Sequence, residues 1–211
     1  MADRKGLFIT FEGTDGLGKS TNLSYFYDLA RRHGISVEIS REPGGTPLGE
    51  EIRKMLIDGS LDSMNSMTEL LLILAARASH ITSKIEPALA AGRWFLCDRF
   101  SDATYAYQGG GRKIDNRIIM QLEKLTNVRL TPDFTFLFDA PPEVGLLRAN
   151  NIGELDRFEK EEIDFYRRVR SAYLELVKKD PEHKLLIDAT QSIASIQKIL
   201  AKQFNSLLSS W

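Results

Sequence analysis

The stretch of sequence that decides the fold is Gly13-Thr14-Asp15-Gly16-Leu17-Gly18-Lys19-Ser20. It matches the phosphate-binding pattern G-x-x-x-x-G-K-[ST]. An apolar segment from Leu7 to Phe11 precedes it and is typical of a buried strand, and apolar residues at helical spacing follow it as far as Ala30. Strand, glycine-rich loop and helix in this order are the context that the pattern requires, so we predict a nucleotide-binding loop here.

The residue types of this loop suit a polyphosphate and a metal ion. Glycines let backbone N–H groups turn toward phosphate oxygens, and the N-terminus of the following helix adds partial positive charge. Lys19 is expected to reach the outer phosphates, and the Ser20 hydroxyl is expected to bind Mg²⁺. The residues expected to bind the nucleotide are Gly13, Thr14, Asp15, Gly16, Leu17, Gly18, Lys19, Ser20 and Thr21.

Composition narrows the class of protein. A chain of 211 residues is long enough for one α/β domain with a sizeable core, and we treat residues 1–211 as a single domain. The formal net charge of −1 offers no electrostatic reason to expect a nucleic acid or an acidic membrane as partner. No apolar run is long enough to span a bilayer, and Cys97 has no second cysteine to pair with. We therefore expect a soluble cytoplasmic protein.

Short apolar runs alternate with helical patterns along the chain. Each run is brief and rich in Val, Ile, Leu or Phe, as strands covered on both faces tend to be. This alternation predicts a parallel sheet with helices on both faces and ligands at the carboxyl ends of the strands. The expected strands are Leu7–Phe11, Ile35–Ile39, Trp94–Cys97, Phe134–Phe138 and Leu185–Ile187.

Two further segments stand out between these runs. The clearest helical pattern extends from Ser66 to Ala91, and we expect Pro87 to bend or break it near its end. The polar segment from Asn150 to Glu154 separates two helical patterns and is the best candidate for a mobile loop.

Charged residues follow several of the predicted strands. Asp98 and Arg99 come directly after the third, and Asp98 is expected to support Mg²⁺ through Ser20 or a water. Arg41 follows the second strand and Arg53 one helical segment later; either of these two alone could be a solvated surface charge. Arginines converging on a triphosphate site suggest a second anionic ligand, and hence phosphoryl transfer between two nucleotides.

Six motifs lie along the chain: Phe11–Thr21, Arg41–Thr46, Asp98–Phe100, Ala106–Arg112, Thr131–Asp133 and Gly153–Arg157. With these motifs in this order, the chain resembles the bacterial thymidylate kinases, which phosphorylate dTMP with ATP. The resemblance extends from about Lys5 to Leu200, and the order and spacing of the motifs are more specific than any one of them. It implies an α/β fold of the P-loop nucleoside monophosphate kinase type, with a five-stranded parallel sheet and a short lid at about residues 148–158. It also implies Mg²⁺, ATP and dTMP as ligands and a homodimer.

The resemblance also implies roles for single residues. Asp15 resembles the acid that hydrogen-bonds the deoxyribose 3′-hydroxyl, and Arg53 and Arg99 resemble the arginines that bind the dTMP phosphate, with Arg41 nearby. Arg77 resembles the residue that reads the thymine O4. The remaining expected substrate contacts are Gln108 and Thr104 at the base and Tyr107 beside the sugar, although core packing explains Tyr107 equally well.

Two positions depart from the family pattern. Ile73 stands where an aromatic residue usually stacks on the thymine, four residues before Arg77 and on the same helix face. Gly16 stands where some members carry a catalytic arginine, so the chain resembles the subtype that supplies this arginine from the lid. Arg157 is then the first candidate and Arg148 the second, and with Lys19, Asp98 and Arg99 they complete the expected catalytic set.

Other readings of the same residues remain open. A kinase for UMP, CMP or another deoxynucleoside monophosphate is the nearest, although Asp15 together with Gly109–Arg112 argues against it. A nucleotide-dependent switch is less favoured, because neither Asp-x-x-Gly nor Asn-Lys-x-Asp occurs at a suitable strand end. Lys19, Ser20, Asp98 and Arg99 are all present, which argues against an inactive relative.

Overall fold

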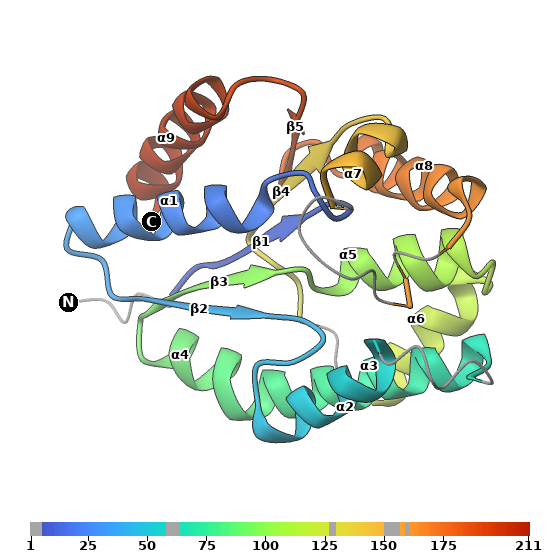
Figure 1. The fold of residues 1–211 in the computed structure, drawn as a ribbon. Coiled ribbons are helices and arrows are strands. Elements are labelled where there is room, and N and C mark those ends of the chain that lie inside the picture. The colour runs from blue at the N-terminus through green and yellow to red at the C-terminus, as the bar shows by residue number, and fades with distance from the viewer. Residues whose placement is uncertain (1–5, 58–63, 127–129, 150–156, 159–160) are drawn as a thin grey trace.

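The computed structural model describes residues 6–57, 64–126, 130–149, 157–158 and 161–211 (Figure 1). Within these ranges the chain forms a five-stranded parallel sheet in the order β2-β3-β1-β4-β5, which confirms the predicted fold class. The strands are β1 Phe8–Glu12, β2 Val37–Arg41, β3 Trp94–Asp98, β4 Phe134–Asp139 and β5 Lys184–Asp188.

Every strand continues past the end of its predicted apolar run. At their carboxyl ends the strands now finish on polar residues: Glu12, Arg41, Asp98, Asp139 and Asp188. They remain in register with their neighbours, as Phe11 with Asp98 and Asp139 with Asp188 show. Backbone pairing does not need an apolar side chain, so apolar runs end before the strands do. The polar side chains therefore gather at one edge of the sheet.

Helices cover both faces of the sheet. In Figure 1, α1 (Lys19–Arg32) and α9 (Ile193–Ser210) lie on one face, and α3 (Ser66–His80) and α4 (Glu86–Ala90) lie on the other. Successive residues of β1 enter different cores: Ile9 packs with Phe26 and Phe204, whereas Phe8 packs with Leu70 and Leu74. The remaining helices are α2 Pro47–Ile57, α5 Ser101–Thr104, α6 Asn116–Leu125, α7 Pro142–Ala149 and α8 Ile163–Lys179.

The predicted helix from Ser66 to Ala91 is not one regular helix. It begins with a capping contact in which the Asn65 side chain accepts from the Thr68 N–H at 2.8 Å. At Ile81–Ile85 it widens into a π-helical turn, η1, in which the Glu86 N–H donates to the Ile81 carbonyl. Pro87 has no N–H and its ring crowds the preceding turn, and the wider turn directly before α4 accommodates it.

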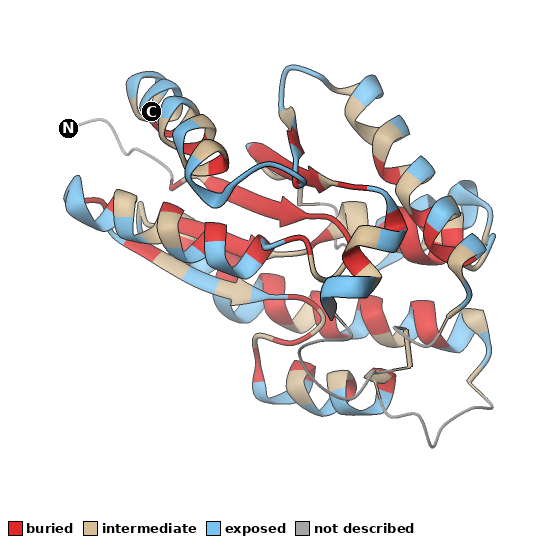
Figure 2. Ribbon diagram, turned by 45° about the horizontal axis from the view of Figure 1, so that its top comes forward, coloured by how far each residue is buried: buried red, intermediate tan, exposed pale blue. Residues whose placement is uncertain are grey.

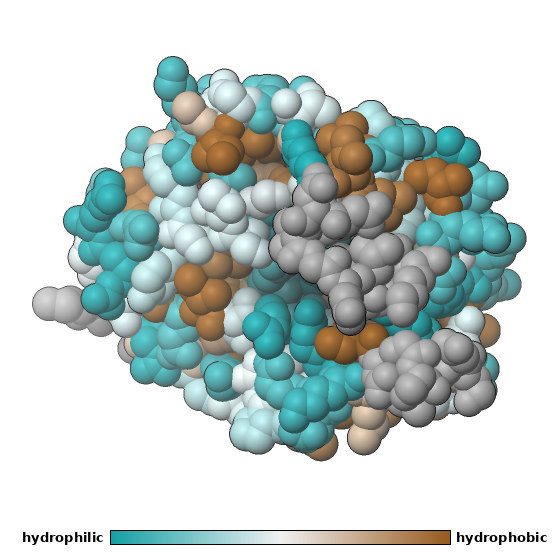
Figure 3. Space-filling view, in the orientation of Figure 1, coloured by the Kyte–Doolittle hydropathy of each residue, from teal (hydrophilic) through white to brown (hydrophobic). Residues whose placement is uncertain are grey.

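The core lies along the central strands, as Figure 2 shows by colour. Cys97 lies inside β3 with no exposed surface, and burial raises the pKa of its thiol well above the usual value. The face shown in Figure 3 is largely hydrophilic, with hydrophobic side chains in separate patches. Among the residues that the structure describes, no helix combines the length and apolar character needed to cross a bilayer.

Candidate active site

The predicted phosphate-binding loop connects β1 to α1. Gly13 has a φ of +129°, and a Cβ atom there would lie 2.3 Å from the Phe138 carbonyl oxygen, so only glycine fits. Lys19 is 5% exposed, and its Nζ donates to the Thr14 carbonyl at 2.7 Å. Burial and the charge of Arg99 lower the pKa of this ammonium group. The lysine is thus held inside the loop, where its charge acts at short range.

Ser20 and Asp98 form the pair of oxygen groups expected for a metal ion. The Ser20 hydroxyl donates to Asp98 Oδ2 at 3.3 Å, because β3 lies directly beside β1. The other carboxylate oxygen, Oδ1 of Asp98, is buried without a hydrogen-bond partner among the described residues. A hydroxyl beside a carboxylate with an uncommitted oxygen fits Mg²⁺, which prefers oxygen ligands.

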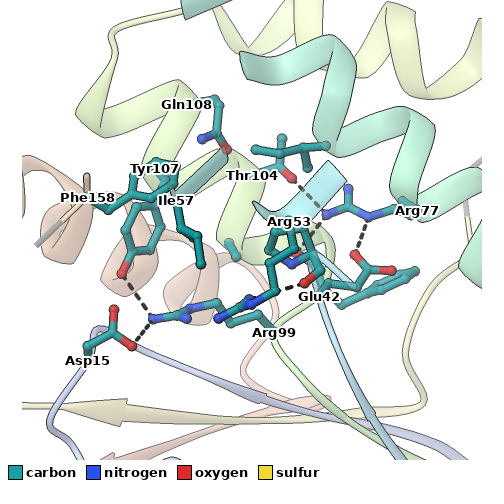
Figure 4. A pocket seen from close by; sticks show the side chains of 14 residues that line it. Asp15, Glu42, Arg53, Ile57, Arg77, Arg99, Thr104, Tyr107, Gln108 and Phe158 are labelled. Atoms are coloured by element: carbon teal, nitrogen blue, oxygen red, sulfur yellow. Dashed lines mark hydrogen bonds and ion pairs between the residues drawn. The ribbon is translucent and has the colours of Figure 1, made fainter. Parts of the chain in front are cut away.

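A cavity opens beside this loop (Figure 4). All of the predicted substrate-binding residues except Arg41 line it: Asp15, Arg53, Ile73, Arg77, Arg99, Thr104, Tyr107 and Gln108. They come from the loop after β1, from α2 and α3, from the loop after β3, and from α5 with the π-helical segment η2 (Tyr105–Gly111). Residues that were singled out from the sequence therefore lie together around one cavity, although their elements are far apart in the chain.

Arg41 is the predicted substrate residue that the structure does not bring to the cavity. Its side chain is 54% exposed, and its guanidinium pairs with Glu50 of α2 at 2.8 Å. The same carboxylate accepts from the Gly45 N–H at 2.9 Å and is thereby fixed beside β2. Glu50 thus holds Arg41 in a separate surface hollow that also contains Ser20 and Lys84.

Arg99 joins the phosphate loop to the cavity. It has a φ of +67°, and its guanidinium donates to Asp15 Oδ1 at 2.7 Å and to the Tyr107 hydroxyl at 3.3 Å. Burial alone would raise the pKa of Asp15, but the positive charges of Arg99 and Lys19 lower it to about 2. Asp15 is therefore an ionised group that faces the cavity although it belongs to the loop.

Arg77 is buried, with 1% of its surface exposed. Its Nε donates to Glu42 at 2.7 Å, and one terminal nitrogen donates to the Phe100 carbonyl and to the Thr104 hydroxyl at 3.0 and 2.8 Å. The other forms an ion pair with Glu123 at 3.4 Å. Burial alone would lower the pKa of Arg77, but the carboxylates of Glu42 and Glu123 raise it. The guanidinium is thus held charged and in one orientation at the cavity wall.

Tyr107 and Gln108 lie in the π-helical segment η2, a type of turn often found at functional sites. Tyr107 contacts Arg99 and also packs edge-on against Phe165 and Tyr173 of α8, so it belongs both to the cavity wall and to the core. Gln108 is 2% exposed and donates from Nε2 to Glu69 at 2.7 Å.

The two candidate lid arginines lie in different places. Arg157 is 12% exposed; its Nε donates to the Leu56 carbonyl at 2.9 Å and a terminal nitrogen donates to Glu69 at 2.6 Å. It lines a separate hollow together with Arg112 and Glu161. Arg148 is exposed at the end of α7 and donates to the Ala189 carbonyl at 3.0 Å. The polar segment Asn150–Glu154 lies outside the described residues.

Several acidic residues of the site were missed from the sequence. Glu42, Glu69 and Glu123 are buried partners of its arginines. From the sequence alone, each would be taken for an ordinary charged residue on the surface. Only Glu69 carries a usable signal, because it lies four residues before Ile73 and eight before Arg77 and so shares their helix face.

Glu12 is a fourth missed acid, at the end of β1. Its two carboxylate oxygens accept from the Phe100 N–H at 2.7 Å and from the Tyr173 hydroxyl at 2.8 Å. Burial, followed by the negative charge of Asp102, raises the pKa of Glu12 to about 7. Because Phe100 follows Arg99 directly, this carboxylate supports the turn that carries Arg99.

Comparisons with known proteins agree on one family. The family model described as thymidylate kinase matches residues 11–199. The thymidylate kinase of Ectopseudomonas mendocina is 51% identical over 203 residues, which are 96% of this chain and 97% of that protein. That of Hahella chejuensis is 46% identical over 94% of this chain and 96% of its own. The crystal structure of thymidylate kinase from Ehrlichia chaffeensis superposes with a TM-score of 0.74 at 32% identity, covering 97% of this chain and 99% of that one.

Proposed function

This chain belongs to the thymidylate kinase family, and from that membership we propose how its residues transfer the γ-phosphoryl group of ATP to dTMP, giving dTDP and ADP. The observation that carries the proposal is the Arg99–Asp15 contact of 2.7 Å. It joins a phosphate-binding loop to a cavity lined by arginines, so that a donor and an acceptor nucleotide can meet there.

On the donor side, the loop from Gly13 to Thr21 binds the ATP phosphates. Backbone N–H groups and Lys19 carry the positive charge that faces the β- and γ-phosphates. Ser20 and Asp98 would hold Mg²⁺, which when bound neutralises charge on the same phosphates. The buried position of Lys19 keeps water away from its charge and strengthens its effect.

On the acceptor side, Arg53 and Arg99 bind the dTMP phosphate and Asp15 accepts from the sugar 3′-hydroxyl. An oxygen of the dTMP phosphate forms the new bond to the γ-phosphorus, and the bond from that phosphorus to the bridging oxygen of ADP breaks. The attacking oxygen is already ionised at neutral pH, so no strong general base is needed. Catalysis then rests on alignment and on charge neutralisation.

The base occupies the far end of the cavity. Arg77 donates to the thymine O4, Gln108 makes a second contact with the base, and Thr104 lies between them, bonded to Arg77. Ile73 covers the base as an aliphatic surface. Tyr107 closes the side where the sugar lies, which disfavours a ribose 2′-hydroxyl.

A further positive charge is needed at the γ-phosphoryl group because Gly16 supplies none. We propose Arg157 for this role, with Arg148 as the second candidate. Arg157 contacts Glu69 and Leu56 in the present arrangement. Its role at the donor side therefore requires that these contacts break when both nucleotides are bound.

A coupled assay of ADP release tests the function. With ATP and Mg²⁺ in excess, we expect dTMP to react faster than dUMP, UMP, CMP, dCMP, AMP or GMP. A Lys19→Met variant purified in the same way controls for contaminating kinases and is expected to be inactive. If another monophosphate reacts fastest, the chain is a different monophosphate kinase. ATP turnover independent of any monophosphate would favour the switch interpretation.

We also propose that the enzyme is a cytoplasmic homodimer. Exposed apolar side chains on α2 and α3 support an interface there: Leu48, Met55, Met67 and Leu71. Light scattering coupled to size-exclusion chromatography tests the assembly, with twice the chain mass expected. Elution at the monomer mass over the whole micromolar range would contradict it.

A further inference from the structure

We propose that Glu69 determines base selectivity by fixing the orientation of the Gln108 side-chain amide. The inference rests on the proposed function, in which Gln108 contacts the base. It assigns Glu69 a positioning role: the side chain acts through Gln108 and does not line the cavity itself.

Glu69 is a completely buried carboxylate in α3. Its Oε1 accepts from Gln108 Nε2 at 2.7 Å, and its Oε2 accepts from a terminal nitrogen of Arg157 at 2.6 Å. Arg112 Nε lies 3.2 Å from both oxygens. Each of these contacts places a nitrogen donor on the Glu69 carboxylate, so Glu69 serves in this cluster as an acceptor.

This contact decides which end of the Gln108 amide faces Glu69. An amide has a donating NH₂ group and an accepting oxygen, and an acceptor-only partner can be satisfied by the NH₂ group alone. The carbonyl oxygen is then the accepting atom that remains for a ligand. Gln108 lines the cavity, and Figure 4 shows its amide directed into it across from Thr104.

The cavity wall thereby presents a defined pair of groups. Arg77 can only donate, and Gln108 is left to accept. A thymine or uracil base offers the matching edge, with an accepting O4 beside a donating N3–H. Cytosine offers the reverse edge, with a donating amino group beside an accepting N3. A buried polar group that faces a like group loses its hydrogen bond, and such mismatches discriminate strongly.

The test is the Glu69→Gln variant, because a glutamine can donate as well as accept and so releases the Gln108 amide to turn over. We measure kcat/KM for dTMP, dCMP and dUMP with ATP in excess. The ratio of dTMP to dCMP is expected to fall about tenfold, since a turned amide can donate to cytosine N3. The ratio of dTMP to dUMP is expected to stay at the wild-type value, because both bases carry the same edge.

Three control variants separate orientation from loss of the ion-pair cluster. Arg112→Gln removes a partner of Glu69 but leaves the Gln108 contact, so the dTMP to dCMP ratio should not change. Glu69→Asp keeps an acceptor-only group and should retain the ratio within about twofold. In a Gln108→Leu background, adding Glu69→Gln should no longer alter the ratio.

An unchanged dTMP to dCMP ratio in folded Glu69→Gln protein overturns the inference, as does an equal fall in both ratios. If that variant does not fold, NMR of the wild-type side-chain amides decides: the Gln108 NH₂ protons, assigned from their loss in Gln108→Leu, should remain protected with and without dTMP. Unprotected protons overturn the proposal. A wild-type enzyme without preference for dTMP would instead contradict the proposed function.

Discussion

Ile73 lines the cavity and is the residue that we propose to cover the base. It is 8% exposed and packs with Ile52, Leu56 and Ala76, so only part of its side chain meets the cavity. We predict that Ile73→Phe lowers KM for dTMP about two- to tenfold, because an aromatic ring adds roughly 0.5–1.5 kcal/mol of stacking. Steady-state kinetics at saturating ATP measure this. Ile73→Leu is the control of equal volume, and an unchanged or higher KM for Ile73→Phe contradicts the prediction.

Arg157 is the residue whose catalytic role is most open to direct test. We predict that Arg157→Ala lowers kcat about a hundredfold or more while KM for ATP changes little, because the lost charge acts in the transition state. Arg148→Ala is the matched comparison and should have a smaller effect. A kcat near wild type for Arg157→Ala would contradict the catalytic role. The contacts of Arg157 with Glu69 and Leu56 would then serve only to hold the structure together.

The arginines that line the cavity could be predicted from the sequence, but the acidic residues that pair with them could not. Arg99 was singled out because it follows a predicted strand within a recognisable motif, whereas the roles of Arg53 and Arg77 came from the family resemblance. Glu42 and Glu123 were not singled out, because an acidic residue gives no sign in the sequence that it is buried beside an arginine. Nor does the sequence reveal that Arg41 pairs with Glu50 outside the cavity.

Among the elements, η2 depends on close contact with α8. A Cβ atom at Gly110 would lie 2.8 Å from Ala172 Cβ and 2.9 Å from the Arg168 carbonyl oxygen. We predict that Gly110→Ala lowers the free energy of unfolding by about 1–3 kcal/mol, because helix and segment must move apart. KM for dTMP should rise as well, since Tyr107 and Gln108 move with η2. Urea denaturation and steady-state kinetics measure the two effects.

Gly109→Ala is the matched control for this prediction. Its added Cβ would meet the Asn116 side-chain oxygen at 2.4 Å, and a side chain can rotate away where a backbone cannot. The loss of stability should therefore be smaller than for Gly110→Ala. Equal losses of stability in the two variants would contradict the prediction, because they would show that the close contact of Gly110 with α8 has no special effect.

Strands and helices could be predicted from spacing, but the π-helical turns could not. The sheet follows from apolar runs separated by helical patterns, and the parallel direction of its strands places their polar carboxyl ends on one edge. A π-helical turn adds a residue to one turn of a helix, which hardly changes the apolar spacing. Pro87 indicated a disturbance of the helix but not its form, and no π-helical turn was predicted at Tyr105–Gly111.

For the molecule as a whole, Glu12 links folding stability to pH. Its pKa rises from 4.5 in the unfolded chain to about 7 in the fold, so the folded state binds the proton more tightly. This contribution is fully present below pH 4.5 and is lost as the pH rises toward 7 and above. Relative to Glu12→Gln, which does not titrate, the wild-type protein should lose roughly 2–3 kcal/mol of stability between pH 5 and pH 8.

Urea denaturation of both proteins at intervals of one pH unit measures this difference. Groups common to both proteins cancel in the comparison, so the remaining slope belongs to Glu12. Parallel curves, or a wild-type protein that gains stability relative to Glu12→Gln as the pH rises, would contradict the pKa shift. The Phe100 N–H can still donate to the amide oxygen of the glutamine, so the turn at Arg99 is expected to persist in the variant.

Because Cys97 is buried within β3, the folded enzyme is expected not to react with thiol-directed dyes. It is the only cysteine in the chain, so a single cysteine introduced on the surface becomes the one site that a maleimide reaches, with no need to remove Cys97 first. Leu147 in α7, 68% exposed, is a convenient place for it. A fluorophore there would report in real time how the region next to the phosphate loop responds when ATP and dTMP arrive, singly and together.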